Sequence, residues 1–296
     1  MGKTREIKKR IKAVANIRRI TKTMQMIATS KFSKAQQRAL ASKPYSRGIF
    51  ELVTELAASA RDTAHPLIRG PRGVQEGAGH LTLVLTSDRG LCGPYNGTIL
   101  RTAMAHLRSL PEQGPIELVG RKGAGFFRFS RMPVARHHTQ FGDTPAYEDV
   151  QRLAQDYMDR FVGGQITGVS VVYMRYISAG RQSPEVLTLL PLKAGADMTG
   201  PVDPGTQIER GAVYEFSPSV EELLDDLLPE AVKVTLCQCF SDAVVSEHVA
   251  RMIAMKAATD NAGKMGKALT RQYNRARQAQ ITTELTEIIS GAAALE

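Results

Sequence analysis

Apolar residues near the start of the chain recur at intervals of three and four positions, and neither glycine nor proline interrupts residues 4–42. This spacing draws one narrow stripe along an otherwise basic helix, and a narrow stripe buries against a single partner helix. We expect the helix to end or kink at Lys43-Pro44, because proline disfavours a helical conformation in the residue before it. A second helical stretch is predicted over residues 45–60. The stripe consists of Ile7, Ile11, Val14, Ile17, Ile20, Met24 and Ile27.

A second helical stripe runs from residue 230 almost to the end of the chain, and Gly263 and Gly266 are its only interruptions. At 1.5 Å per residue this helix reaches roughly 90 Å. Pro229 is expected to separate the first turns from the main helix or to kink it. Each glycine costs a helix interior about 1 kcal/mol, so the helix is predicted to be locally weak there. The stripe contains Val232, Leu236, Phe240, Val244, Met252, Met255, Leu269, Tyr273, Ala276, Leu285 and Ile288.

The two narrow stripes are most simply buried against each other, which predicts a long antiparallel coiled coil of the N- and C-terminal helices. The last helix is longer than the first, so its tip is left without a partner. That tip, residues 288–295, reads IISGAAAL and is apolar. We therefore expect it to be exposed unless another molecule receives it.

Between the terminal helices, short β-branched or leucine-rich runs alternate with candidate helices. This alternation predicts βαβ units and a largely parallel sheet, so the fold class is α/β, with a Rossmann-like domain added to the coiled coil. The Gly- and Pro-rich segments 66–80 and 193–211 are interpreted as linkers. The predicted division is a coiled coil of residues 1–60 and 212–296 and an α/β domain of residues 61–211. Strands are predicted at 81–86, 116–119, 169–177 and 186–190, helices at 98–110, 121–130 and 147–162, and a helix start at Ser217-Pro218.

Basic residues are concentrated at the start of the chain. Residues 1–47 hold fourteen Lys and Arg against the single acid Glu6, a net charge of +13, whereas the whole chain carries +10. An acidic partner is expected: nucleic acid, an anionic membrane surface or a carboxylate-rich protein. Phe32 is the only aromatic residue of the first helix, and the apolar stripe must be buried, so nucleic acid is less favoured than a solvated charged face. Composition alone does not decide between an acidic protein partner, nucleic acid and a solvated charged face.

The cysteine content and the hydropathy favour a cytoplasmic location. Three cysteines in a chain of 296 residues do not form a disulfide scaffold, and they suit a reducing compartment. Cys237 and Cys239 point to different faces of a helix, so buried thiols are favoured over a metal or redox pair. No apolar run approaches the ~18 residues that span a bilayer, and the N-terminus lacks the apolar core of a signal peptide.

The loop at residues 86–93, TSDRGLCG, lies between a predicted strand and a predicted helix, where an α/β protein would hold a phosphate. It matches neither GxGxxG nor GK[ST], so a structural turn is favoured over a nucleotide site. His137 and His138 are adjacent on a predicted strand, and their rings should face opposite sides, which disfavours a shared metal site. No spacing of nucleophile, base or carboxylates indicates a catalytic centre, and no cofactor or metal is predicted.

Four segments closely resemble the γ subunit of bacterial F-type ATP synthases. They are EIKKRIKAVANIRRITKTMQMIATSKFSKAQ near the start, the loop TSDRGLCG, the run SEHVARMIAMKAATDNA and the ending YNRARQAQITTELTEIISGAAAL. MKAATDNA and ITTELTEIISGA are the most specific. Residues 115–210 match mainly by length and pattern.

The resemblance implies a noncatalytic central-stalk rotor that couples ion flow through the membrane c-ring to ATP synthesis or hydrolysis in the α/β ring. The coiled coil would stand inside the ring of α and β subunits, and the α/β domain would sit on the c-ring. The implied partners are the α, β and ε subunits and the c-ring, without nucleic acid. The implied location is peripheral, on the cytoplasmic face of the bacterial inner membrane. The alternative function is a basic coiled-coil protein that binds nucleic acid.

The resemblance also assigns contact residues. The contact with the c-ring maps onto Tyr214 and Glu215 in the segment AVYEFSP. Contacts with the α/β ring map onto Lys22, Met24, Lys31, Arg251, Gln278, Thr282, Glu284, Thr286 and Glu287.

The chain departs from the family pattern at two places. Pro94 follows Gly93 where the family commonly has a second glycine. Residues 263–267, GKMGK, replace a run that is usually more acidic and aliphatic. The second departure predicts a weaker and more basic stretch of the last helix.

Overall fold

The first and last helices are the longest elements of the computed structural model, which describes residues 2–59, 65–71, 73–192 and 220–293. Helix α1 spans Gly2–Ser59 and helix α6 spans Val220–Ala293. Each contains an interior proline, Pro44 in α1 and Pro229 in α6. Of the two outcomes expected at each proline, an end of the helix at Pro44 and a break at Pro229 are therefore wrong, and a kink stays a prediction.

Burial of the following turns explains why neither helix stops at its proline. An interior proline costs about 3 kcal/mol. Beyond Pro44, Phe50 and Val53 are buried, and beyond Pro229, Val232 and Leu236 are fully buried. Each large apolar side chain contributes roughly 1.5–3 kcal/mol when it leaves water, so two of them offset the proline.

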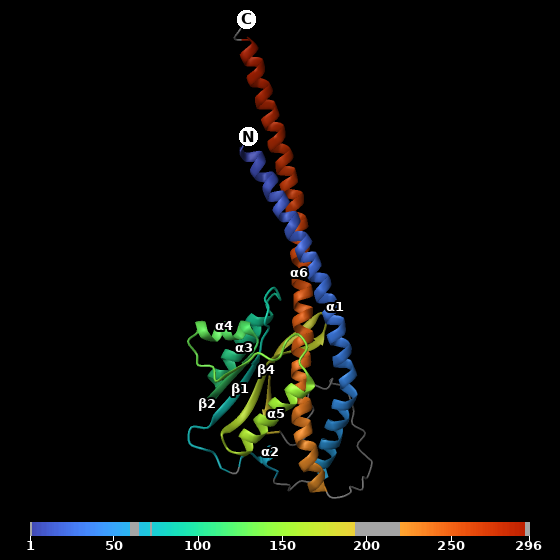
Figure 1. The fold of residues 1–296 in the computed structure, drawn as a ribbon, viewed down its shortest axis with the longest axis vertical. Coiled ribbons are helices and arrows are strands. Elements are labelled where there is room, and N and C mark those ends of the chain that lie inside the picture. Colours follow the sequence, from blue (N-terminus) through green and yellow to red (C-terminus); the bar gives the residue numbers. More distant parts are fainter. Residues whose placement is uncertain (1, 60–64, 72, 193–219, 294–296) are drawn as a thin grey trace. The chain divides into compact units, whose positions relative to one another are not determined.

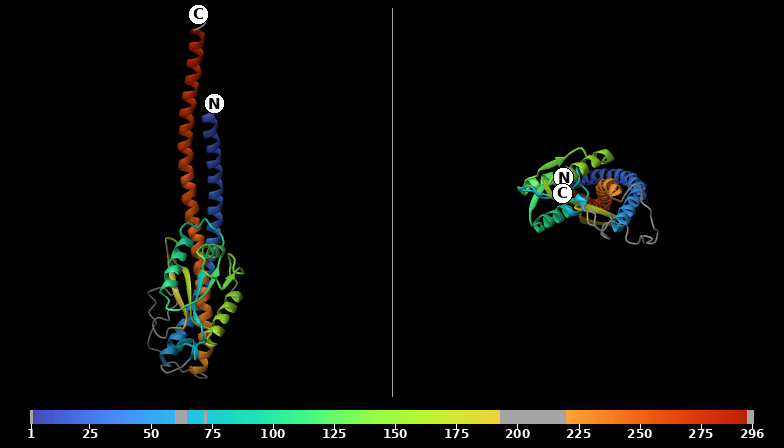
Figure 2. Two further views of the ribbon diagram at one scale, coloured as in Figure 1. Left: turned by 90° about the vertical axis from the view of Figure 1, so that its left-hand side faces the viewer. Right: turned by 90° about the horizontal axis from the view of Figure 1, so that it is seen from below.

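The chain divides into two compact units, a helical unit of residues 1–30 and 251–296 and a globular unit of residues 31–250. In the helical unit the Thr4 hydroxyl donates to Gln280 at 2.9 Å, and the hydroxyl oxygens of Thr21 and Thr259 lie 2.8 Å apart. Later residues of α1 thus contact earlier residues of α6, which confirms the predicted antiparallel pairing. The two helix segments of this unit run side by side in Figure 1 and Figure 2.

Both interrupting glycines of α6 remain helical and lie opposite α1. A Cβ atom added to Gly263 would lie 3.7 Å from the Arg18 Nε atom, and one added to Gly266 would lie 4.0 Å from Val14 Cγ1. These are ordinary van der Waals distances. The backbone approach to α1 therefore does not require glycine at either position.

The globular unit is built on a five-stranded sheet of order β3-β2-β1-β4-β5. Strands β3, β2, β1 and β4 are parallel, and β5 is antiparallel to β4. This confirms the predicted α/β fold with a largely parallel sheet. The strands are β1 (Gly79–Leu85), β2 (Gln113–Val119), β3 (Arg136–His138), β4 (Ile166–Ser178) and β5 (Arg181–Leu190).

Helices cover both faces of the sheet (Figure 1). On one face, Leu83 of β1 belongs to a core that includes Tyr157 and Val232 from α5 and α6. On the other face, Val84 shares a core with residues from α3 and α4, among them Ile99. The alternation along β1 therefore separates two cores. The shorter helices are α2 (Pro66–Arg69), α3 (Tyr95–Ser109), α4 (Arg121–Phe129) and α5 (Tyr147–Val162).

The first predicted linker is partly wrong, because residues 66–80 contain helix α2 and the start of β1. The side chain of His65 accepts a hydrogen bond from the Leu67 amide at 3.1 Å, and Pro66 occupies the first turn. Leu67 is buried in the core, so α2 is anchored rather than exposed. Strand β5 also begins five residues earlier than predicted, at Arg181.

Several expectations fall on residues outside the described ranges. They include the domain boundaries at residues 60–61 and 211–212, the second linker, and the helix start at Ser217. They remain predictions. Among the described residues, no helix is both long enough and apolar enough to cross a membrane.

Candidate functional site

The loop at residues 86–93 uses its polar groups within the protein. The Thr86 hydroxyl lies 2.8 Å from the Val119 carbonyl oxygen and 2.9 Å from the Gly123 amide nitrogen. The Asp88 carboxylate accepts from the Arg121 amide at 3.0 Å, at the first residue of α4. A phosphate would lie at the N-terminus of α3, the helix that follows the loop, but the polar groups of the loop are engaged with β2 and α4 instead. The geometry therefore favours the structural turn over the nucleotide site.

The crevice beside this loop is covered by α6. In doubly wound folds ligands bind at the carboxyl ends of the strands, where the strand order reverses. Here the Tyr95 hydroxyl, just after β1, donates to the Ala243 carbonyl at 3.1 Å. The Ser246 hydroxyl donates to the Met174 carbonyl of β4 at 3.2 Å. The remaining cavity measures about 30 Å³, far below the roughly 300–1,000 Å³ of small-molecule sites.

A buried ionic network joins β2, β3 and α5. Glu117 of β2 accepts from Arg160 at 2.8 Å and from the Tyr157 hydroxyl at 2.9 Å, and it lies 2.7 Å from His138 Nε2. Burial alone would raise the pKa of Glu117, but the hydrogen bonds from His138, Arg160 and Tyr157 outweigh it and lower that pKa to about 2. This network anchors α5 and the edge strand β3 to the sheet. His138 is buried and His137 is exposed, as predicted for opposite faces.

This network was not predicted, although the sequence holds a signal for it. Glu117 interrupts an apolar strand, and a carboxylate in a buried strand requires a partner. The sequence does not indicate that Arg160 supplies it, because the two residues lie 43 positions apart.

The thiols are unreactive structural groups. Cys92 and Cys239 are buried and Cys237 is partly buried, and none forms a disulfide. Burial raises the pKa of Cys237 to about 12 and also raises the pKa of Cys239. Cys237 and Cys239 are therefore thiols rather than thiolates at neutral pH, which agrees with the prediction of buried thiols at this pair.

The contact residues predicted in the helical unit lie mostly on its surface. Lys22 is exposed and Met24 is partly buried. In α6, Arg251 is partly buried. The other five predicted contacts of this helix are exposed: Gln278, Thr282, Glu284, Thr286 and Glu287. Beyond Gln280, the residue that meets Thr4, two apolar residues of the tip are also exposed, with exposed fractions of 68% for Ile288 and 60% for Ile289.

The exposed hydroxyls near the tip bond to their own helix. Thr282 donates to the Gln278 carbonyl at 3.0 Å, and Thr286 donates to the Thr282 carbonyl at 2.8 Å. The Glu284 carboxylate accepts from Gln280 at 2.8 Å. Gln278, Thr282 and Thr286 therefore follow one line along the helix, at intervals of four. Glu287 is the last of the predicted contacts in this segment.

Lys31 is placed differently from the other predicted contacts, because it forms an ion pair with Asp143 in the globular unit. Tyr214 and Glu215, the predicted c-ring contacts, lie outside the described residues. The structure thus places five of the six predicted ring contacts of α6 near its tip, with Arg251 farther back along the helix, and it engages Lys31 within the chain.

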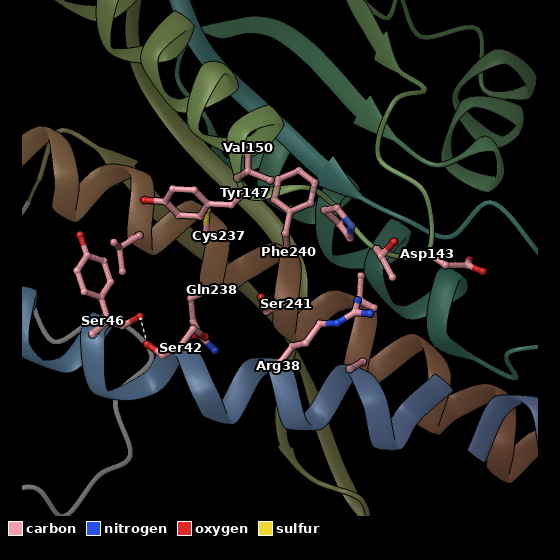
Figure 3. A pocket seen from close by; sticks show the side chains of 16 residues that line it. Arg38, Ser42, Ser46, Asp143, Tyr147, Val150, Cys237, Gln238, Phe240 and Ser241 are labelled. Carbon is pink, nitrogen blue, oxygen red and sulfur yellow. Dashed lines mark hydrogen bonds between the residues drawn. The ribbon is translucent and has the colours of Figure 1, made fainter. Parts of the chain in front are cut away.

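A cavity of about 230 Å³ lies in the globular unit between α1, α6 and the start of α5. Figure 3 shows Arg38 and Ser42 of α1 on one side and Phe240 and Ser241 of α6 facing them, with Tyr147 above. Side chains of both helices line this space, so α1 and α6 are not close-packed here.

Comparison with known proteins identifies the family. A model of the ATP synthase family matches residues 3–295. The ATP synthase gamma chain of Rhodopirellula baltica is 43% identical over 299 residues, covering 100% of both chains. That of Leptospira biflexa is 37% identical over 298 residues, also covering 100% of both chains.

Two solved structures share the fold. The rotor of the Euglena gracilis mitochondrial ATP synthase matches with a TM-score of 0.65 at 17% identity, covering 95% of this chain and 99% of that chain. The central stalk of the Tetrahymena thermophila enzyme matches with a TM-score of 0.54 at 19% identity, covering 81% of this chain and 99% of that chain. At these identities the likeness concerns the fold alone, whereas the full-length sequence relatives decide the family. The chain belongs to the ATP synthase gamma-chain family.

Proposed function

We propose that this chain is the central-stalk rotor of a bacterial F-type ATP synthase and that it couples ion flow through a c-ring to ATP synthesis or hydrolysis in an α/β ring. The observation that carries the proposal is the antiparallel helix pair, in which α6 continues past Gln280, the residue bonded to Thr4, with exposed apolar residues such as Ile288. A soluble protein rarely leaves such a surface uncovered unless another molecule receives it. In this family that molecule is the ring of α and β subunits.

The chain contributes mechanics and no chemistry of its own. The crevice that would hold a nucleotide is filled by α6, and its loop caps α4. At any moment the rotor presents a different part of its surface to each of the three β subunits. A surface that interacts unequally with the open and closed states of a partner shifts its equilibrium between them.

The ring contacts are Lys22, Met24, Lys31 and Arg251 together with the polar residues near the tip, Gln278, Thr282, Glu284, Thr286 and Glu287. Exposure of Lys22 and of the five tip residues supports this assignment. The basic face of α1 suits acidic surfaces of the β subunits.

The contact with the c-ring is assigned to Tyr214 and Glu215, and the ε subunit binds the same stalk. This arrangement makes the chain peripheral to the membrane, on the cytoplasmic face of the bacterial inner membrane. No finding supports the alternative of nucleic-acid binding, which would require retention on DNA or RNA that falls steeply with salt.

The test is reconstitution with α and β subunits. The full-length chain is expected to co-purify with them and to support coupled ATP synthesis, and a chain cut after Thr270 is expected to support less. Glu284→Gln and Glu287→Gln should lower coupling, whereas Glu112→Gln, at an exposed site of the globular unit, should not. Failure of both the full-length and the cut chain to form a complex would overturn the proposal.

A further inference from the structure

Residues 31–36 of α1 are held by two different elements of the globular unit. The Lys31 ammonium pairs with the carboxylate of Asp143, in the segment that leads into α5. The rings of Phe32 and Tyr176 lie 6.2 Å apart between centroids, and Tyr176 is near the end of β4. Gln36 Nε2 donates to the Tyr176 hydroxyl at 3.3 Å. We call these three contacts the α1 clamp.

The polar half of the clamp is electrostatically well supported. The hydrogen bond from Lys31 lowers the pKa of Asp143 and outweighs the opposing effect of burial, and the charges of Arg89 and His248 lower it further. Asp143 is therefore ionised throughout the neutral range. The side chains of the pair are 38% and 33% exposed, so solvent weakens the attraction without abolishing it.

The packing beside the clamp is loose. The 230 Å³ cavity separates α1 from α6 between Ala35 and Ser46 (Figure 3). Close packing returns at Ile49 and Val53, which join the core of the globular unit. A cavity removes van der Waals contacts from its lining, so this stretch of α1, in which Ala39 is buried, depends more on the attachments at its two ends.

Helix α6 is held in another way. Val232 and Leu236 are fully buried in the same core, and backbone carbonyls of α6 and β4 take part in hydrogen bonds between the elements. The globular unit therefore grips α6 through extensive apolar burial and grips α1 near residue 31 through one ion pair and one aromatic side chain.

We propose that Asp143 and Tyr176 are positioning residues that fix the rotational phase of α1 against the globular unit, so that torque passes through α1 as well as α6. This inference rests on the proposed rotor function. It also gives Lys31 a role inside the rotor, in addition to the proposed contact with the α/β ring. Loss of the clamp leaves the loosely packed stretch of α1 free to twist, which makes the rotor more compliant.

The experiment uses the complex with α and β subunits, fixed to a surface, with a bead attached to the globular unit. The angular variance of the bead during catalytic pauses measures the torsional compliance of the rotor. Asp143→Asn and Tyr176→Ala are each expected to raise this variance, Tyr176→Phe less so, and Lys31→Arg is expected to keep the unmodified value. Asp149→Asn is the matched control, because it breaks an exposed ion pair with Arg152 inside α5.

The outcomes separate the clamp from the function it rests on. An unchanged variance in both Asp143→Asn and Tyr176→Ala overturns the clamp. A rise with Lys31→Met but none with Asp143→Asn also overturns it, because Lys31 then acts on the ring. If the unmodified chain forms no complex, the rotor function itself fails.

Discussion

The hydroxyl oxygens of Thr21 and Thr259 lie 2.8 Å apart in the helical unit, although 238 positions separate them in the sequence. Both residues are only 9% exposed. Thr259 also bonds to the Met255 carbonyl, and Thr21 to that of Arg18. A buried polar pair of this kind fixes the register of two helices whose apolar stripes alone would tolerate a shift.

Replacing either threonine of this pair is expected to lower the free energy of unfolding nearly as much as replacing both. Thr259→Val leaves the Thr21 hydroxyl without its partner across the helices and should lower the free energy of unfolding by about 1–2 kcal/mol. Adding Thr21→Val should cost little more. Urea denaturation of the full-length chain, analysed as a double-mutant cycle, measures the coupling, and additive effects would show that the pair does not act as a unit.

Gly266→Ala is expected to stabilise the helical unit by about 1 kcal/mol, because alanine has the higher helix propensity. Its Cβ atom would meet Val14 at an ordinary distance of 4.0 Å. Gly123→Ala, in α4, is the opposite case, since its Cβ atom would lie 2.7 Å from Thr86 Oγ1. Thermal unfolding should shift upward for the first variant and downward for the second. A downward shift for both would mean that the close approach at residue 266 needs glycine.

Glu117→Gln is expected to destabilise the globular unit by about 3 kcal/mol, because it leaves Arg160 without its buried counter-charge. Asp156→Asn, which removes a more exposed partner of Arg160 at 3.5 Å, should cost less than about 1 kcal/mol. Chemical denaturation measures both values. Equal effects of the two variants would contradict a dominant role for Glu117.

The same carboxylate sets an acid limit on stability. Its pKa is about 2 in the folded chain against an ordinary 4.5. The unfolded state therefore binds the proton more readily, so the stabilisation is fully present above pH 4.5 and is lost as the pH falls toward 2. In Glu117→Gln the decline of unfolding free energy across this window should be shallower, and an unchanged decline would assign it to other carboxylates.

His80 and His106 add a second pH window. Their ring centroids lie 6.1 Å apart. Burial lowers the pKa of both histidines below 6.5, and the charge of His106 lowers the pKa of His80 further. Each ring therefore takes up its proton at lower pH in the folded chain than in the unfolded chain, so their contribution to stability is complete above pH 6.5 and falls as the pH drops below it. Unfolding measured against pH should show a smaller loss in His106→Gln, and the same loss as in the unmodified chain would exclude this pair as its cause.

Local patterns predicted the elements whose periodicity is strong. The alternation of strands and helices from Leu81 onward corresponds to observed elements, and the predicted first helix lies within α1. The predicted burial of its whole apolar stripe was wrong, because Ile17, Ile20 and Ile27 are more than half exposed. Proline rules failed at Pro44 because burial of Phe50 and Val53 outweighs the local cost. Helix α2 was missed for a related reason, since its anchor Leu67 acts through the distant core.

The long-range polar contacts were beyond the reach of sequence patterns. Lys31 and Asp143 lie 112 positions apart, and neither stands in a pattern that requires a partner. The charge of the first helix indicated an acidic partner in general, but it did not indicate that one of its lysines pairs inside the chain. Family resemblance supplied the ring contacts, and their exposure is consistent with that assignment.

Direct observation of rotation tests the central claim. The α/β ring is fixed to a surface, a bead is attached to the globular unit of this chain, and ATP is added. The rotor function predicts sustained unidirectional rotation that depends on ATP and slows when the chain is cut after Thr270. Steady ATP hydrolysis by the same complexes with a bead that stays fixed, or that only diffuses about one angle, would contradict it.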